Sequence, residues 1–220
     1  DNDYLIHKNI NNMNRPDISQ FLAHFTSNKF PKGFKDPDNP TNSYKYVSPE
    51  KRLISILEGR KIIASQMPWI GKHNAVCFTE CPWASLITHT QQYSSYGIGF
   101  TKNFIFNKGG GPVYYVRADV FNSQQWDDAV LPYVTPFWPL YAPKGIKPLG
   151  TSRAGQTIFC DYSHEREWRV AHDLEFEYED VQFVVLPDYM AMARFPKELK
   201  DAIGREKFLL MDNYKMIEEL

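Results

Sequence analysis

The sequence predicts a single α+β domain with strand-rich mixed sheets and a few short helices, and three observations carry that prediction. The chain has 220 residues, a length that suits one domain with a real hydrophobic core. Aromatic residues make up 15% and charged residues 23%, which is typical of a folded globular protein. Apolar runs of strand length outnumber segments of helical pattern. We expect residues 1–19 to form an N-terminal arm and residues 20–220 the domain.

Apolar runs and their flanking turn residues predict the elements of the first half. Phe21–Ser27 is short, apolar and aromatic, which indicates a buried strand. Ser48 and Pro49 are typical of a helix start, and Gly59 is a natural residue to follow its end. Two glycines in residues 96–100 predict close approach of another part of the chain. The expected elements are strands at 21–27, 61–65, 75–79 and 96–100 and helices at 49–58, from Pro82 and at 101–107.

The second half predicts five more strands, one helix and a long irregular segment. Residues 127–155 lack periodicity, and their five prolines are interleaved with aromatic side chains. A segment this long is functional or disordered, and the aromatic content favours an ordered flap over a site. The alternative is a packed surface loop with no ligand. The strands are expected at 112–117, 165–171, 175–179, 181–186 and 207–211, and the helix at 196–203.

The most chemically suggestive stretch is the charged strand predicted at 165–171. The two-residue period of a strand puts Glu165, Glu167 and Arg169 on one face and Trp168 on the other. Two carboxylates about 7 Å apart, with a guanidinium nearby, could hold a sugar hydroxyl or stabilise a developing cation. The alternative is a surface ladder of ion pairs over a buried tryptophan, which would contribute little to stability.

Charge, cysteine content and hydropathy limit the environment and the partners. No apolar run approaches the roughly 18 residues of a membrane span, so we expect no membrane partner. Three cysteines make no even disulfide framework, and no glycosylation sequon with a non-proline centre is present, which favours a cytoplasmic location. Residues 1–110 carry 13 Lys/Arg against 8 Asp/Glu, and residues 111–220 carry 12 against 18. Neither half is basic enough to predict a nucleic-acid partner, although the first half could favour a small anion such as a dinucleotide.

Five motifs in the order of this chain resemble the AbiGi family, over about residues 20–175. The family groups abortive-infection, phage-resistance proteins that are labelled the antitoxin of a type IV toxin–antitoxin pair. The resemblance therefore implies a regulatory or binding role beside a cognate toxin. The motifs are Phe21–Thr26 (FLAHFT), Val76–Pro82 (VCFTECP), Tyr96–Lys102 (YGIGFTK), Gly111–Val116 (GPVYYV) and Glu165–Arg169 (EREWR).

The order of three elements is also similar to the ADP-ribosyltransferase fold. These are a histidine on the first strand, a strand with a hydroxyl side chain and a late Glu-x-Glu. This resemblance implies NAD as a possible cofactor, Glu167 as the catalytic carboxylate and Glu165 as its substrate-facing partner. The expected NAD contacts are His24 and Thr26 to the ribose, Thr79 as a supporting hydroxyl, Arg169 or Arg153 to the pyrophosphate, and Tyr96 or Trp138 stacked on nicotinamide. The activity would be that of an ADP-ribosyltransferase or an NAD glycohydrolase.

Other chemistries remain open on the sequence. His73, Cys77, Cys81 and His89 supply four zinc-competent side chains, but at a spacing that is not standard, and we expect no metal. A nucleophilic Cys77 or Cys160 would need a neighbouring histidine that sequence does not place. A buried strand histidine such as His24 is more often a core residue than a ligand. A third reading of the whole chain is a non-catalytic adaptor without a small ligand.

Overall fold

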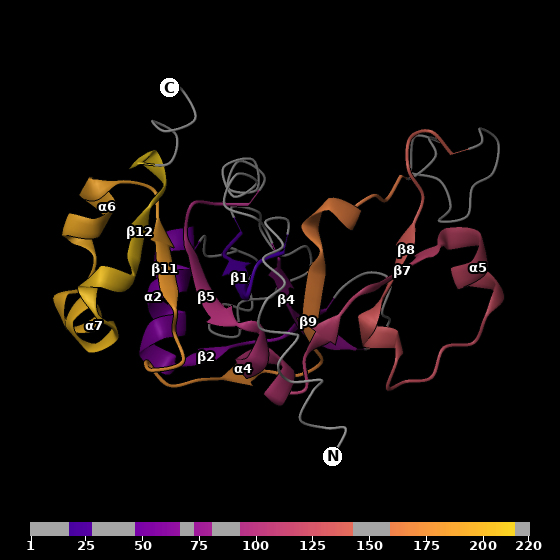
Figure 1. Ribbon diagram of the computed structural model, residues 1–220, viewed down its shortest axis with the longest axis horizontal. Coiled ribbons are helices and arrows are strands. Elements are labelled where there is room, and N and C mark those ends of the chain that lie inside the picture. The colour runs from indigo at the N-terminus through magenta and orange to yellow at the C-terminus, as the bar shows by residue number, and fades with distance from the viewer. Residues whose placement is uncertain (1–17, 28–46, 67–72, 81–92, 143–158, 214–220) are drawn as a thin grey trace, which may run out of the picture.

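The computed structural model confirms a mixed α+β protein built on a strand-rich sheet (Figure 1). It describes residues 18–27, 47–66, 73–80, 93–142 and 159–213. An eight-stranded sheet has the order β12-β11-β5-β1-β4-β9-β6, with β3 paired to β4 as well. Its strands are β1 (Phe21–Phe25), β3 (Ser65–Gln66), β4 (Asn74–Thr79), β5 (Gly97–Thr101), β6 (Gly111–Pro112), β9 (Glu167–Val170), β11 (Phe183–Leu186) and β12 (Phe208–Leu210).

Two small sheets and five short helices complete the described fold. β2 (Lys61–Ile62) pairs antiparallel with β10 (Leu174–Glu175), and β7 (Tyr114–Arg117) pairs parallel with β8 (Val134–Phe137). Figure 1 places α6 and α7 at one end of the molecule and α5 with β7 and β8 at the other. The helices are α2 (Pro49–Gly59), α4 (Lys102–Asn107), α5 (Ala118–Ser123), α6 (Tyr189–Arg194) and α7 (Lys197–Ile203).

The two faces of the large sheet carry different side chains. Register places Ala23 opposite Thr79, and Thr79 opposite Glu167, so these three side chains share one face. That face carries a small apolar cluster: Ala23, Phe25, Phe183, Val185 and Met211. The opposite face packs on α2, α6 and α7 and forms the main core, which includes Leu22, Leu53, Phe78, Ile98, Phe100 and Leu199. Most of the buried apolar side chains therefore lie on one face of the sheet, whereas the buried polar side chains of Thr79 and Glu167 lie on the other.

The predicted close approach at the glycines of β5 is confirmed. A Cβ on Gly99 would lie 2.2 Å from Cζ of Phe183, and one on Gly97 would lie 2.8 Å from Cδ1 of Phe25. The aromatic rings of the small apolar cluster thus lie directly on the β5 backbone. Only glycine at these positions lets the rings pack this closely.

The start of α2 agrees with the sequence prediction, but its end differs. Ser48 caps the helix through its side chain, which accepts a hydrogen bond from the backbone N–H of Lys51. Gly59 is the last helical residue, and the left-handed position after it is Arg60, with φ of 48°. The prediction that Gly59 terminates the helix was therefore wrong by one residue. The guanidinium of Arg60 pairs with Glu177 at the surface.

Several predicted strands are shorter or divided. The strand predicted at 61–65 is two short strands, β2 and β3, and that at 112–117 is divided between β6 and β7 in different sheets. The strand predicted at 175–179 is only the two-residue β10, Leu174–Glu175, and a turn follows at residues 178–180. The irregular segment predicted at 127–155 contains β8, and α5 and α6 were missed. The helix predicted from Pro82 lies outside the described residues.

Candidate functional site

The charged stretch around Glu167 is a corner followed by a strand, not one continuous strand. Ser163–Glu165 forms a turn of 3-10 helix, Arg166 adopts a left-handed conformation with φ of 44°, and β9 begins at Glu167. The prediction that Glu165 belongs to the strand was therefore wrong. Even so, Glu165, Glu167 and Arg169 are only 6%, 7% and 0% exposed. This burial excludes the alternative of an exposed ladder of ion pairs.

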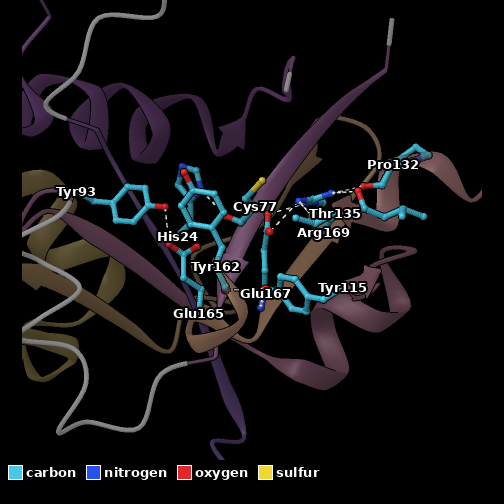
Figure 2. Close-up of polar contacts among 11 residues, drawn as sticks. His24, Cys77, Tyr93, Tyr115, Pro132, Thr135, Tyr162, Glu165, Glu167 and Arg169 are labelled. Atoms are coloured by element: carbon cyan, nitrogen blue, oxygen red, sulfur yellow. Dashed lines mark hydrogen bonds and ion pairs between the residues drawn. The ribbon is translucent and has the colours of Figure 1, made fainter. Parts of the chain in front are cut away.

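Glu167 and Arg169 form a two-pronged ion pair across one pleat of β9 (Figure 2). Nε of Arg169 donates to Oε1 of Glu167 at 2.7 Å, and Nη2 donates to Oε2 at 2.8 Å. The guanidinium also donates to the carbonyls of Pro132 and Val134 at 2.9 and 3.2 Å and to Oγ1 of Thr135 at 2.5 Å. Segment 132–135 therefore holds Arg169, and Arg169 fixes the carboxylate of Glu167.

Glu165 has a different environment from that of Glu167. Its Oε1 accepts a 2.8 Å hydrogen bond from the hydroxyl of Tyr93. No hydrogen bond from a described residue to Oε2 is present. Burial raises the pKa of this carboxyl group, and the Tyr93 hydrogen bond opposes that shift. The pKa of Tyr93 is itself raised by burial and then by the Glu165 charge, so its hydroxyl stays protonated as the donor.

Backbone contacts hold the corner between the two carboxylates. The hydroxyl of Thr79 donates to the carbonyl of Glu165 at 2.7 Å. The hydroxyl of Tyr115 donates to the carbonyl of Tyr162 at 3.0 Å and accepts from the backbone N–H of Glu167 at 3.1 Å. Thr79 thus lies beside the pair, and its hydroxyl is bonded to the backbone of the corner. Tyr93, Tyr115 and Tyr162 were not predicted as site residues. Of these, only Tyr115 lies in a motif quoted for the family.

His24 lies two strands from Glu167, on the opposite face of the sheet, because it pairs with Ile98 of the main core. Its Nδ1 is 2.9 Å from the carbonyl oxygen of Cys77. Because a carbonyl only accepts, Nδ1 carries the proton and Nε2 is the free acceptor of the neutral ring. Burial lowers the pKa of His24, which favours that neutral form. The ring also packs against Phe78 at a centroid distance of 5.9 Å. No hydrogen bond joins His24 to either described carboxylate of the site.

Thr26 and Tyr96 belong to a different set of contacts. The hydroxyl of Thr26 lies 3.2 Å from the carbonyl of Pro49, 3.1 Å from that of Tyr96 and 3.1 Å from Oγ of Ser94. The pKa of Tyr96 is raised by burial and then by the charge of Glu50 on α2. These side chains therefore connect the end of β1 with the start of α2 and the segment before β5. The structure does not bring them to Glu167.

The thiols near the carboxylates are unsuited to nucleophilic attack. Burial, and then the charge of Glu167, raises the pKa of Cys77 well above its ordinary value. Burial, and then Asp161, raises the pKa of Cys160 to about 11. Both thiols are therefore protonated near neutral pH, whereas the thiolate is the nucleophile.

Other predicted ligand positions are only partly described. Cys81, His89 and Arg153 lie outside the described residues, and the described ranges contain no group of three or more potential metal-binding side chains. Trp138 is 2% exposed, with Arg117 over its ring, so it offers no free face for stacking on nicotinamide. Its Nε1 is buried without a hydrogen-bond acceptor.

None of the helices in the described ranges combines the length and the hydropathy that crossing a bilayer requires.

Comparison with known proteins gives one match. The model of the family described as "Putative abortive phage resistance protein AbiGi, antitoxin" matches residues 42–198. No curated protein and no solved structure matches the chain. The matched range contains four of the five motifs quoted above but not Phe21–Thr26, which precedes it. Because this range covers more than two thirds of the 220 residues, the chain belongs to the AbiGi family.

Proposed function

We propose that the protein acts in phage defence as the antitoxin-type or regulatory partner of a cognate toxin. The observation that carries this proposal is the family match over residues 42–198, whose description names both phage resistance and the antitoxin role. The described fold is compatible with a binding role, because the large sheet has a full apolar core on one face and buried polar groups on the other. The partner in this proposal is a protein encoded together with this chain.

Co-expression tests this proposal. The neighbouring gene is induced alone, together with this chain, and together with an Arg169→Met variant that serves as a destabilised control. We expect the neighbouring gene to stop growth and this chain to restore it. Toxicity from this chain alone, or growth arrest that it does not relieve, would contradict the antitoxin role.

A second candidate function is NAD-dependent chemistry, as an ADP-ribosyltransferase or NAD glycohydrolase. Two observations favour it. The three strands that carry the elements similar to that fold, β1, β4 and β9, are neighbours in the sheet, and Thr79 and Glu167 share one face of it, whereas His24 lies on the other face. Glu165 and Glu167 are both buried beside tyrosines, as expected of carboxylates that work in a partly dehydrated site.

The proposed chemistry uses the carboxylates to stabilise charge. Cleavage of the bond between nicotinamide and ribose develops positive charge on the ribose, and a fixed carboxylate beside the sugar stabilises it. In this proposal Glu167 is the catalytic carboxylate and Glu165 is its substrate-facing partner, whereas His24, on the other face of the sheet, does not contact the same ribose. The nicotinamide-ribose end of NAD fits this donor set. The pyrophosphate does not fit Arg169, whose guanidinium is fully buried and bonded to four acceptor groups.

Calorimetry with NAD, combined with a turnover assay, tests the second candidate. We expect saturable binding of NAD and turnover that Glu167→Gln abolishes. Glu175→Gln is the matched control, since Glu175 is an exposed carboxylate on β10. Equal turnover by Glu167→Gln and the parent would contradict the catalytic role. If the protein does not bind NAD at millimolar concentration, the second candidate is wrong. The remaining functions are then those that require only binding to a protein partner, as an antitoxin or as a non-catalytic adaptor.

A further inference from the structure

Two neighbouring tyrosines of β7 point to opposite faces of the small sheet that β7 forms with β8. The hydroxyl of Tyr115 reaches the corner before β9, where it contacts the backbone of Tyr162 and Glu167 (Figure 2). Because side chains alternate along a strand, Tyr114 lies on the other face, where its ring meets that of Trp126. The surface around Tyr114 is therefore separate from the carboxylates of the candidate site.

Three aromatic rings form a continuous surface here, and we call Tyr114, Phe121 and Trp126 the aromatic platform. The rings of Trp126 and Phe121 are stacked, with their centroids 5.8 Å apart and 24° between their planes. Tyr114 meets Trp126 edge to face at a centroid distance of 6.4 Å. Nε1 of Trp126 donates to the carbonyl of Phe121 at 3.0 Å, which fixes the indole. A partner that binds here therefore loses little free energy in ordering these side chains.

The platform lies outside the buried core of this end of the molecule. The buried apolar side chains of β7 and β8 include Val116 and Val134. Tyr114, by contrast, is 58% exposed, and Phe121 and Trp126 are each only partly buried. A single exposed apolar side chain is ordinary, whereas contiguous tyrosine and tryptophan rings on a surface are typical of a protein interface.

The charges around the platform select the sign of the partner. Residues 111–137 carry three acidic side chains and one basic side chain: Asp119, Asp127, Asp128 and Arg117. Arg117 pairs with Asp119, which balances both charges. Asp127 and Asp128 directly follow Trp126, and the side chain of Asp128 is 70% exposed beside His73. This acidic surplus repels phosphate groups and attracts arginine and lysine, which also bind the faces of aromatic rings.

We propose that the aromatic platform is a docking surface for a protein partner that presents arginine or lysine side chains to the rings and to Asp127 and Asp128. The inference deepens the first proposed function and rests on it for the identity of the partner, which is the protein encoded together with this chain. It does not involve the carboxylates of the second candidate function. The position of β7, β8 and α5 at one end of the molecule leaves the platform accessible to a partner of any size (Figure 1).

Calorimetry with the whole protein and the purified product of the neighbouring gene tests the inference. We expect Trp126→Ala to weaken binding at least about tenfold and Tyr114→Ala to weaken it several-fold. Tyr189→Ala is the matched control and should leave binding unchanged, because Tyr189 is 73% exposed on α6, at the opposite end of the molecule (Figure 1). If Trp126→Ala does not fold, Tyr114→Ala still decides the result, since it alters an exposed side chain.

A second pair of variants tests the charge of the partner. The double variant Asp127→Asn with Asp128→Asn removes both charges, and asparagine can still accept the hydrogen bond that Asp127 receives from the backbone N–H of Ala129. We expect it to bind the partner several-fold more weakly at low salt and to differ much less from the parent at high salt. Glu175→Gln should bind as the parent does. Equal affinities of the double variant and the parent at low salt would overturn the assignment of a basic partner.

The binding assay and the growth assay fail separately. Binding that the platform variants weaken supports the inference even if the neighbouring protein is not toxic, in which case only the antitoxin role is wrong. No binding, or binding that Trp126→Ala and Tyr114→Ala leave unchanged, overturns the inference even if growth is restored. Light scattering on the protein alone gives one more outcome: a dimer that Trp126→Ala dissociates would show that a second copy of this chain occupies the platform, and the inference would then be wrong.

Discussion

Replacing Arg169 by methionine should be among the most destabilising single changes in the chain. Arg169 is completely buried and bonded to Glu167, Pro132, Val134 and Thr135, so its removal leaves an unpaired carboxylate and three unused acceptors. Removing one partner of a buried ion pair costs about 3–5 kcal/mol. For a chain of this size each kcal/mol lowers Tm by about 2–4 °C, so we expect Tm to fall by about 6–20 °C.

A double-mutant cycle measured by urea unfolding separates the pair from its surroundings. Glu167→Leu combined with Arg169→Met removes both charges, and we expect it to be more stable than Arg169→Met alone by at least about 1 kcal/mol, because no buried charge is left unpaired. The matched control is the exposed pair Arg60 and Glu177, where Arg60→Met should cost less than about 1 kcal/mol. A loss below about 1 kcal/mol for Arg169→Met would refute the idea that the pair is sealed in the fold.

Three further outcomes are expected from other parts of the molecule. Gly99→Ala should destabilise by about 1–3 kcal/mol in urea unfolding, because its Cβ would meet the ring of Phe183 at 2.2 Å. Ser48→Ala should cost about 1 kcal/mol in the same assay, since it removes the cap of α2. Burial raises the folded pKa of Glu165 above 4.5, so the folded state binds more protons. Wild-type stability should therefore fall relative to Glu165→Gln as pH rises from about 4.5 through the raised pKa, as measured by unfolding at several pH values.

Sequence patterns within a few residues were sufficient to predict the elements that do not depend on contacts with distant parts of the chain. The cap at Ser48 and the apolar run of β1 lie within a few neighbouring residues, and both elements are present as predicted. The glycines of β5 also revealed a close approach, although the sequence did not identify Phe183 and Phe25 as the rings involved. In these cases, the residues that determine the structure are the same residues that carry the signal.

The remaining elements depend on contacts that sequence periodicity does not contain. β8 is a strand because it pairs in parallel with β7, about 20 residues earlier, and Pro136 within it disguises the strand pattern. The single left-handed residue Arg166 breaks the predicted strand before Glu167, and arginine gives no local signal for that conformation. Two-residue strands such as β2 and β10 exist because each supplies the other's hydrogen bonds.

The same reasoning applies to the site. Alternation along a strand correctly placed Glu167 and Arg169 on one face, because that depends on the chain's local geometry alone. Their burial was not predictable, since it comes from Pro132, Val134 and Thr135, more than 30 residues away. Tyr93 was missed for the same reason. His24 alternates with Ala23 along β1 and therefore lies on the face opposite to Glu167, and Thr26 contacts Pro49, Ser94 and Tyr96 instead.

The separation of the two sheet faces makes function and stability experimentally distinguishable. The main core packs on the face that meets α2, α6 and α7, so substitutions on the opposite face leave most of the apolar burial intact. On that opposite face, Arg169 is bound on all sides, whereas Glu165 contributes one hydrogen bond through Oε1. A change at Arg169 should therefore reduce stability and activity together. A change at Glu165 should alter ligand binding with a far smaller loss of stability. A loss of function in a Glu165 variant can therefore be attributed to the site itself, because the fold stays intact.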